Sequence, residues 1–245
     1  MKLTDLSTIM KDCGIVGAGG AGFPSYAKLN EKADTIILNC AECEPLLKLH
    51  RQVMAEYASE ILEAMHEVAL AVGASDIIVA LKPNYTQAIA AIEQVLPSYQ
   101  DKNARIGLLP PVYPSGDEII TIYEVTGRVV PAGKLPIEVG CIVYNVETML
   151  NIYYAIKENR PVTHKYCTIT GAVKNPVTVK LPLGITVKEA LALAGGPTIE
   201  EYEIVSGGPM TGRLCTEFDV VTKTSNAYIV LPKSHYVVQK KKANT

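Results

Sequence analysis

The sequence predicts an α/β protein with two parts: a domain built on a largely parallel, buried sheet, and after it a small β-grasp-like domain. Up to residue 158, short continuous apolar runs alternate with segments whose apolar residues recur at helical spacing. That alternation is typical of parallel strands covered by helices. Beyond a Pro-containing stretch at 158–164, strand-like runs flank one helical segment in the order ββαββ, over about 70 residues. With 245 residues, 48% of them hydrophobic, the chain is long enough to bury a sizeable core.

The first domain is expected to begin with an amphipathic segment at 3–10, followed by the glycine-rich stretch GIVGAGGAGFPSYAKL at 14–29. Four buried-type strands come next: TIILN at 35–39, DIIVAL at 76–81, RIGLLP at 105–110 and CIVYN at 141–145. The predicted helices are one with apolar positions from Leu46 to Val68 that Gly73 ends, one over 85–96 stopped by Pro97, one at about 117–125 and one over 147–158.

The second domain is expected to open with strands KYCTITGAV and VTVKLP, at 165–173 and 177–182. A helix over 186–196 follows, with Thr186 as its N-cap and Gly195-Gly196 as its stop. EIVSGGPMTG and AYIVLP, at 203–212 and 227–232, supply two more strands. These elements predict domains at 1–162 and 163–233 and a polar tail at 234–245, in which Lys240-Lys241-Lys242 is a solvated terminus.

The composition excludes several classes of protein. A net charge of −2 provides no basic field for nucleic acid or for an anionic membrane. No apolar run approaches the ~20 residues that a membrane-spanning helix needs, and no signal-peptide pattern opens the chain. The six cysteines are scattered, which indicates reduced thiols and a cytoplasmic protein rather than a disulfide framework.

The glycine stretch contains Gly17-Ala18-Gly19-Gly20-Ala21-Gly22, which fits G-x-G-x-x-G. A dinucleotide fingerprint needs a strand before the first glycine and a helix that opens at the third. Here only CGIV precedes the cluster, and Phe23-Pro24 follows it, so that Phe23 is restricted to extended conformations. The pattern therefore favours a backbone cradle for a phosphate or a flat ring, with Lys28 adding a charge, over either a Rossmann fingerprint or a flexible turn.

Three further stretches follow in order: LNCAECEPLLKLHRQVM at 38–54, a Pro/Gly-rich segment at 113–140, and VYNVETMLNIYYAI at 143–156. With the glycine stretch in front of them, the chain resembles the RnfC-like family and the FMN- and NADH-binding subunit of respiratory complex I. The long forms of the motifs are most similar to the cobalamin-reductase branch and the proline-reductase-associated branch of the family. The second domain resembles the SLBB (soluble-ligand-binding β-grasp) domain of the same proteins, so that the resemblance covers nearly all of the chain.

This resemblance implies a Rossmann-like domain that binds FMN without a covalent bond. The motif that reads Asn-Ala-Asp-Glu-Ser-Glu-Pro in the complex I subunit is Asn39 to Pro45 here, with Ala41 in place of the aspartate. By residue-to-residue matching, the FMN contacts would be Gly17, Gly19, Gly20, Gly22, Lys28, Asn39, Glu42, Tyr113, Gly116, Asp117, Asn145 and Thr148. The NADH contacts would be Phe23, which would stack on nicotinamide or adenine, and Glu44 and Glu118.

The implied function is an NADH-oxidising flavoprotein that passes electrons through FMN to an Fe–S domain, and from there to a protein partner, a corrinoid or a reductase. Hydride transfer belongs to the cofactors, so no side chain is expected to act as a catalytic acid or base. The Cys-rich motifs that hold [4Fe–4S] clusters in larger relatives are absent, which favours a chain truncated before that domain. The location would be the cytoplasm, the inner face of a membrane complex or a microcompartment.

Two rival functions remain: a docking module that binds no flavin, kept open by Ala41, and an ordinary NAD-dependent dehydrogenase.

Three local features of the sequence also have more than one interpretation. Cys40-Ala41-Glu42-Cys43 fits C-x-x-C, a pattern found in redox and zinc sites. No second cysteine pair accompanies it and the histidines are dispersed, so a metal role is not expected. The histidines are predicted to lie at the surface or to have packing roles. Asp117-Glu118 suits helix capping as well as acid–base chemistry. SGGPMTG at 206–212 is equally a β-turn or a ligand site.

Overall fold

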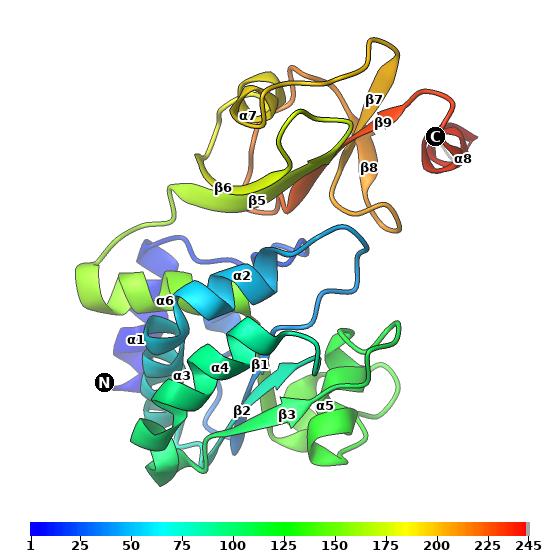
Figure 1. The fold of residues 1–245 in the computed structure, drawn as a ribbon. Coiled ribbons are helices and arrows are strands. Elements are labelled where there is room, and N and C mark those ends of the chain that lie inside the picture. The colour runs from blue at the N-terminus through cyan, green and yellow to red at the C-terminus, as the bar shows by residue number, and fades with distance from the viewer. Residues whose placement is uncertain (244–245) are drawn as a thin grey trace. The chain divides into compact units, whose positions relative to one another are not determined.

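The computed structural model describes residues 1–243, and the chain divides into two compact units (Figure 1). The first unit comprises Met1–Gly17, Phe23–Cys43 and His50–Val162. The second comprises Ala18–Gly22, Glu44–Leu49 and the chain from Thr163 on. Two short segments from the N-terminal half, the tip of the glycine stretch and residues 44–49, therefore belong to the C-terminal unit. Each unit has its own sheet and its own buried core.

The first unit is built on a four-stranded parallel sheet in the order β3-β2-β1-β4. These strands are β1 (Thr35–Asn39), β2 (Asp76–Leu81), β3 (Arg105–Leu108) and β4 (Cys141–Asn145). The chain moves outward from β1 to β3 and then returns to the other side of β1 for β4. The strand order thus reverses between β1 and β4, and in open α/β sheets ligands bind outside the carboxyl ends of the strands at such a point.

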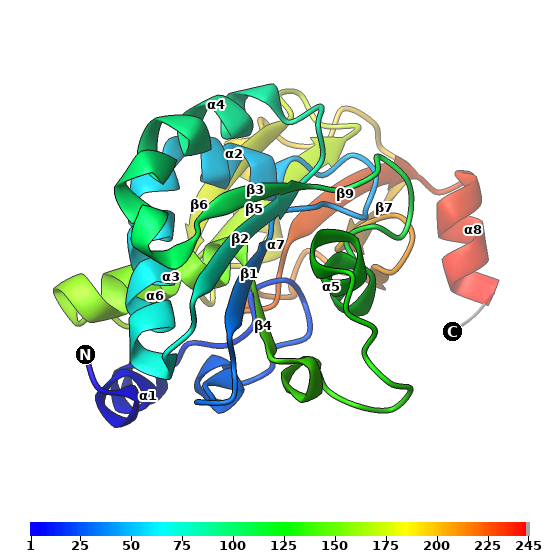
Figure 2. The same ribbon diagram turned by 90° about the horizontal axis from the view of Figure 1, so that it is seen from below.

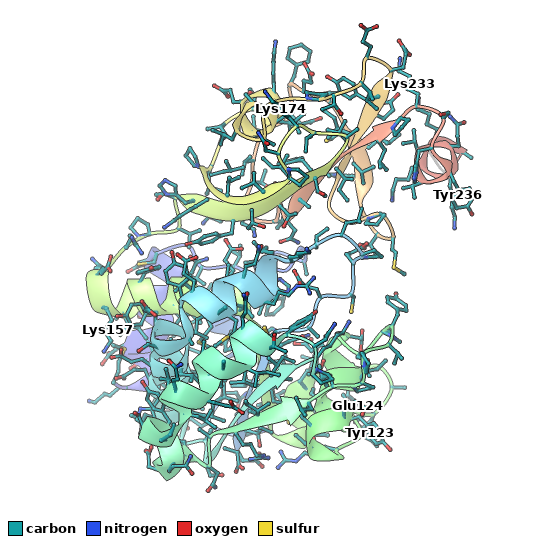
Figure 3. All side chains as sticks on the ribbon, viewed as in Figure 1. Tyr123, Glu124, Lys157, Lys174, Lys233 and Tyr236 are labelled. Carbon is teal, nitrogen blue, oxygen red and sulfur yellow. The ribbon has the colours of Figure 1, made fainter. Side chains whose placement is uncertain are left out.

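Helices cover both faces of this sheet, as Figure 2 shows for the first unit. On one face lies α5 (Glu118–Thr126), whose Ile122 packs against Ile37, Ile78 and Val143. The solvent-exposed side of α5 carries Tyr123 and Glu124, which are labelled in Figure 3. The other helices of the unit are α1 (Leu3–Asp12), α2 (Leu49–Glu56), α3 (Ala58–Val72), α4 (Thr86–Val95) and α6 (Val146–Glu158), with 3-10 turns η1 (Ser25–Lys28), η2 (Leu96–Lys102) and η3 (Pro136–Val139).

The single helix predicted from Leu46 to Gly73 is wrong, because the structure has two helices there. Leu46 has a φ of 71°, outside the helical region, and the first helix begins only at Leu49. The backbone then leaves helical geometry at Tyr57 (φ −121°, ψ 33°), after which α3 runs to its left-handed cap Gly73. Both helices bury apolar residues at helical spacing, so the periodic pattern continues across the break and conceals it.

The second unit has a five-stranded mixed sheet in the order β6-β5-β9-β7-β8, in which only β5 and β9 pair in parallel. Its elements are β5 (His164–Gly171), β6 (Val177–Pro182), α7 (Val187–Leu193), β7 (Tyr202–Ser206), β8 (Arg213–Cys215), β9 (Ala227–Pro232) and α8 (Tyr236–Ala243). Helix α7 begins with a capping box between Thr186 and Glu189 and packs on one face through Val187, Ala190 and Leu191.

Two elements of this unit differ from the sequence prediction. Strand β8 pairs with β7, and its three residues were too few for a sequence pattern. Residues 234–245 were expected as a polar tail, but α8 forms over Tyr236–Ala243, and its Val238 is fully buried beside Ile229 and Leu47. The last two positions of that predicted tail, 244–245, lie outside the described residues. Lys242 forms an ion pair of 2.6 Å with Glu203. Among residues 1–243, none of the helices combines the length and the apolarity that crossing a bilayer requires.

Candidate functional site

The carboxyl ends of β1 and β4 bring two predicted flavin contacts together. Asn39 is the last residue of β1 and Asn145 the last residue of β4, and the two are directly paired in the strand register. They lie at the reversal of strand order, where the fold places ligands. Sequence patterns located both strands, but only the parallel pairing of β1 with β4 makes these two amides neighbours.

Asn39 connects two loops of the site through both ends of its amide. Its Nδ2 donates to the carbonyl of Gly116 at 2.8 Å, and its Oδ1 accepts from the backbone N–H of Ala41 at 3.1 Å. Gly116 is packed so closely that a Cβ there would lie 2.6 Å from Cys43 Sγ and 2.9 Å from the Ala41 carbonyl oxygen. Glycine is therefore required at this position by packing, independently of any ligand.

Lys28 reaches the same edge of the sheet from η1. Its Nζ lies 2.6 Å from Glu118 Oε1 and donates to the Val143 carbonyl at 2.9 Å. The turn η1 is held to β4 because the Tyr144 hydroxyl donates to the Ser25 carbonyl at 3.0 Å. Burial raises the pKa of Tyr144, so this hydroxyl keeps its proton far into the alkaline range. The lysine side chain is about 30% exposed and remains accessible from solvent.

Glu42 is buried, and its carboxylate is stabilised by groups of α2. Oε1 accepts from the backbone N–H of His50 at 3.1 Å, and Oε2 lies 3.4 Å from Arg51 Nε. The backbone of Glu42 is fixed as well: its carbonyl accepts from Lys82 Nζ at 2.9 Å, and its N–H donates to the Tyr85 hydroxyl at 3.3 Å. Burial is the main cause that raises the pKa of Tyr85 to about 12. Glu42 thus shapes the loop after β1.

His50 lies beside Asn145, one of the predicted FMN contacts, and the sequence analysis gave it no place at this edge of the sheet. Its Nε2 lies 2.9 Å from Asn145 Nδ2, while Asn145 Oδ1 accepts from the Glu147 N–H at 3.0 Å and caps α6. The available signal was its place in the 38–54 motif, eight residues after Glu42 and within the first turn of α2.

The other predicted contacts in the first unit differ widely in exposure. Asp117 is the N-cap of α5 and accepts from the N–H groups of Ile119 and Ile120, so the capping interpretation is confirmed. Thr148 is almost fully buried in α6, whereas Phe23 is 49% and Tyr113 62% exposed. The N–H of Gly17 donates to the Phe23 carbonyl at 2.8 Å, which closes the base of the glycine stretch.

The glycine stretch lacks the geometry of a dinucleotide fingerprint, as predicted. Val16 forms only an isolated bridge with Pro24, so no strand leads into the first glycine. A 3-10 turn follows at Ser25–Lys28 in place of an α-helix. Gly20 and Gly22 have φ values of 117° and 66°, which favour glycine, and they belong with Gly19 to the second unit.

Glu44, a predicted NADH contact, is bound inside the second unit by the 206–212 turn. Its Oε2 accepts from the Met210 N–H at 2.8 Å, and its Oε1 accepts from the Thr211 N–H at 2.7 Å and from the Thr211 hydroxyl. A Cβ at Gly208 would overlap the Glu44 carboxyl group. Of the two interpretations of SGGPMTG, the turn is therefore present, and it holds a carboxylate of the chain itself.

Cys40, the first cysteine of the pair in the 38–54 motif, is made unreactive by its surroundings. Cys40 is fully buried, and burial raises the pKa of its thiol, with the Glu42 carboxylate adding to the effect. A thiol of raised pKa is a poor nucleophile and a poor metal ligand at neutral pH. Across residues 1–243, no group of three or more His, Cys, Asp or Glu side chains is placed to hold a metal ion.

Comparison with known proteins identifies relatives of both units. The Nuo51 FMN-binding domain family matches residues 10–154, and the SLBB domain family matches residues 166–214. Cobalamin reductase PduS of Citrobacter freundii is 44% identical over 243 residues, which cover 98% of this chain and 53% of that protein. A component of the proton-translocating ferredoxin:NAD(+) oxidoreductase complex of Clostridium ljungdahlii is 33% identical over 240 residues, 96% of this chain and 52% of that protein.

A solved structure has the same fold. An NAD+-reducing [NiFe]-hydrogenase in the H2-reduced state matches with a TM-score of 0.78 at 20% identity, over 96% of this chain and 48% of that one. These matches confirm the predicted family resemblance and the predicted fold class. The chain spans about half the length of the relatives that it matches.

Proposed function

We propose, from the premise that the chain belongs to the family of the Nuo51 FMN-binding domain, that its first unit binds FMN and that the protein is an oxidoreductase module for electron transfer. The observation that carries this proposal is the reversal of strand order between β1 and β4, with Asn39 and Asn145 paired at the carboxyl ends. Bound there, FMN would supply the chemistry: it accepts a hydride from NADH and releases electrons singly.

The chemistry of the predicted contacts in the first unit supports this proposal. Lys28 has three N–H groups, of which Glu118 and the Val143 carbonyl take two, so one donor remains for the phosphate or the ribityl chain. Asn145 offers an amide whose orientation is fixed by the α6 cap. Phe23 is half exposed and would provide a stacking platform for nicotinamide or adenine. For Gly19, Gly20, Gly22 and Glu44, the FMN and NADH roles remain predictions from the resemblance.

The onward path of the electrons is part of the proposal. A flavin reduced by two electrons needs a one-electron acceptor, and we place a [4Fe–4S] domain in that position, outside the present sequence. The final acceptor would be a corrinoid or a partner reductase, in keeping with the names of the cobalamin reductase and oxidoreductase-complex relatives.

One observation favours a second candidate, a docking module without flavin. Both ends of the Asn39 amide are already engaged by protein groups, and Lys28 is already paired with Glu118. Together with Ala41 in place of the motif's aspartate, this arrangement would be stable with nothing bound. The two candidates differ in one property, the affinity for FMN.

The deciding experiment is a titration of the purified protein with FMN, followed by anaerobic addition of NADH. Tight binding, with a flavin spectrum that NADH bleaches, supports the proposal. Binding of NADH that does not depend on FMN would instead indicate an ordinary NAD dehydrogenase. Failure to retain FMN at micromolar concentration would overturn the flavin role and leave the docking module.

A lysine variant tests the location of the flavin. Lys28→Met removes a charge-assisted hydrogen bond, and we expect FMN affinity to fall about tenfold or more. Lys157→Met is the matched control, because Lys157 lies on α6, pairs with Glu63 and is labelled away from the sheet edge in Figure 3. Equal affinities for the two variants would argue against Lys28 as a contact.

A further inference from the structure

His50 and Asn145 come from distant parts of the sequence and meet at the carboxyl edge of the first unit's sheet. His50 lies in the first turn of α2, and its backbone N–H is held by Glu42 Oε1 at 3.1 Å. Asn145 ends β4 and caps α6. Their side chains meet with 2.9 Å between His50 Nε2 and Asn145 Nδ2. Neither the family match nor the motif comparison gives His50 a role.

The direction of this hydrogen bond follows from the cap. The Glu147 N–H can only donate, so the Asn145 atom 3.0 Å from it must be the oxygen. The Asn145 atom that faces His50 is then the NH2 group, which can only donate. His50 Nε2 must therefore accept, which requires a neutral imidazole with its proton on Nδ1.

Protonation of His50 would turn this acceptor into a donor. Nε2–H would then face Nδ2–H2 at hydrogen-bond distance, and two donors repel each other. Rotation of the Asn145 amide by half a turn would relieve that contact, but would set NH2 against the Glu147 N–H and remove the cap of α6. Either outcome displaces the amide at the end of β4.

We propose that His50 is a positioning residue for the flavin contact Asn145, which it orients as a neutral acceptor and releases when its ring is protonated. The proposal rests on the proposed FMN function and adds to it a residue and a pH dependence. His50 is not a catalytic residue, since it acts through Asn145.

The charged groups around His50 come from three elements. Glu42, on the loop after β1, binds the His50 backbone N–H, and Arg51, the next residue of α2, lies 3.4 Å from the same carboxylate. Glu147, in the first turn of α6, is buried next to the cap. The pH range to test is the one, between about pH 5 and 8, in which histidine side chains in general change protonation.

The test compares FMN affinity from pH 5.5 to 8 in the protein and two variants. His50→Gln supplies an oxygen that accepts from Asn145 and does not titrate, whereas His50→Leu supplies no acceptor. We expect the affinity of the wild-type protein to fall at least fivefold on acidification. His50→Gln should bind within twofold of wild type at pH 8 and keep that affinity at pH 5.5. His50→Leu should bind about fivefold more weakly at both pH values.

The outcomes separate this inference from the proposed function. If the wild-type protein does not bind FMN at pH 8, the proposed function itself is wrong. If the wild-type protein binds FMN but the FMN affinity of His50→Gln also falls on acidification to pH 5.5, the inference is overturned and the proposed function stands. His66→Gln is the matched control and should keep the wild-type profile, because His66 pairs with Asp101 on η2, away from Asn145.

A second measurement needs neither FMN nor a folded leucine variant. The chain has four histidines, so nitrogen NMR of the imidazoles resolves few signals, and His50→Gln assigns one set by its loss. We expect the His50 proton on Nδ1 at pH 8. A proton on Nε2 at that pH would overturn the inference directly.

Discussion

Acidic side chains at the sheet edge of the first unit and at the 206–212 turn of the second unit are held in different ways. At the sheet edge of the first unit, Lys28 and Glu118 are held by side-chain pairing, and Glu42 by a backbone N–H together with Arg51. In the second unit, Glu44 lies against consecutive backbone N–H groups of a glycine-rich turn. Side-chain pairing can adjust at its flexible ends, whereas the close approach of Glu44 to Gly208 leaves no room for a Cβ. Substitutions at glycine should therefore separate the two arrangements more clearly than substitutions of the charges.

The largest effect is expected from Gly208→Ala in the second unit. The new Cβ would overlap the Glu44 carboxyl group and expel it from Met210 and Thr211. Loss of hydrogen bonds to a charged group should lower the free energy of unfolding by about 2 to 3 kcal/mol, measured by urea denaturation. The control is the double variant with Glu44→Ala, in which the overlap is gone. If Gly208→Ala lowers the free energy of unfolding as much in the Glu44→Ala background as in the wild-type protein, the clash with Glu44 is not the cause.

A smaller effect is expected from Gly116→Ala in the first unit. Its Cβ would lie 2.6 Å from Cys43 Sγ and 2.9 Å from the Ala41 carbonyl oxygen, so the loop after β1 must shift. Overpacking of this kind lowers the free energy of unfolding by about 1 to 2 kcal/mol. Cys43→Ala in the same chain should rescue only part of the loss, because the backbone contact with Ala41 remains. Complete rescue would show that the side chain alone sets the limit.

Tyr144→Phe should expose the alkaline sensitivity of the first unit. The pKa of Tyr144 is raised in the folded state, so its stabilising effect is complete below the unfolded pKa of about 10 and is lost as the pH rises above it. The variant should be about 1 kcal/mol less stable at pH 7, since the bond to the Ser25 carbonyl is gone. Its stability should then fall less steeply above pH 10 than that of the wild-type protein. If the free energy of unfolding falls equally steeply with pH above pH 10 in both proteins, Tyr144 is not the source of the alkaline sensitivity.

The smallest effect is expected from Asp219→Asn in the second unit, at the acid end of the pH range. Asp219 accepts from the Thr216 N–H and hydroxyl, and these bonds lower its pKa below the usual 3.8. The stabilisation is present above the unfolded pKa and is lost as the pH falls through the folded one. Hydrogen exchange around residue 216 should therefore rise below about pH 3.8 in the wild-type protein. The variant should show exchange there that does not depend on pH beyond the intrinsic chemistry.

Sequence reasoning predicted the strands of the sheet that carries the candidate site, and helix caps in both units. TIILN, DIIVAL and CIVYN match β1, β2 and β4 residue for residue, because continuous apolar runs mark strands buried on both faces. Thr186 was predicted as a cap, and capping was one of two interpretations of Asp117, because a cap is a local hydrogen bond, within three residues of its partner. Ordered motifs then identified the family, since four short matches in sequence are far more specific than one.

By itself, then, the sequence determined most of the elements, their order and the family of this protein, because apolar periodicity, caps and motifs act over a few neighbouring residues. Only the tertiary structure decided that His50 meets Asn145, that Glu44 enters the 206–212 turn, and that Val238 and Leu47 share a core. Those partners lie 95, 166 and nearly two hundred residues apart along the chain, and their hydrogen bonds and contacts leave no periodic trace in it. The break at Tyr57 belongs with them, because burial on both sides of it kept the helical pattern intact.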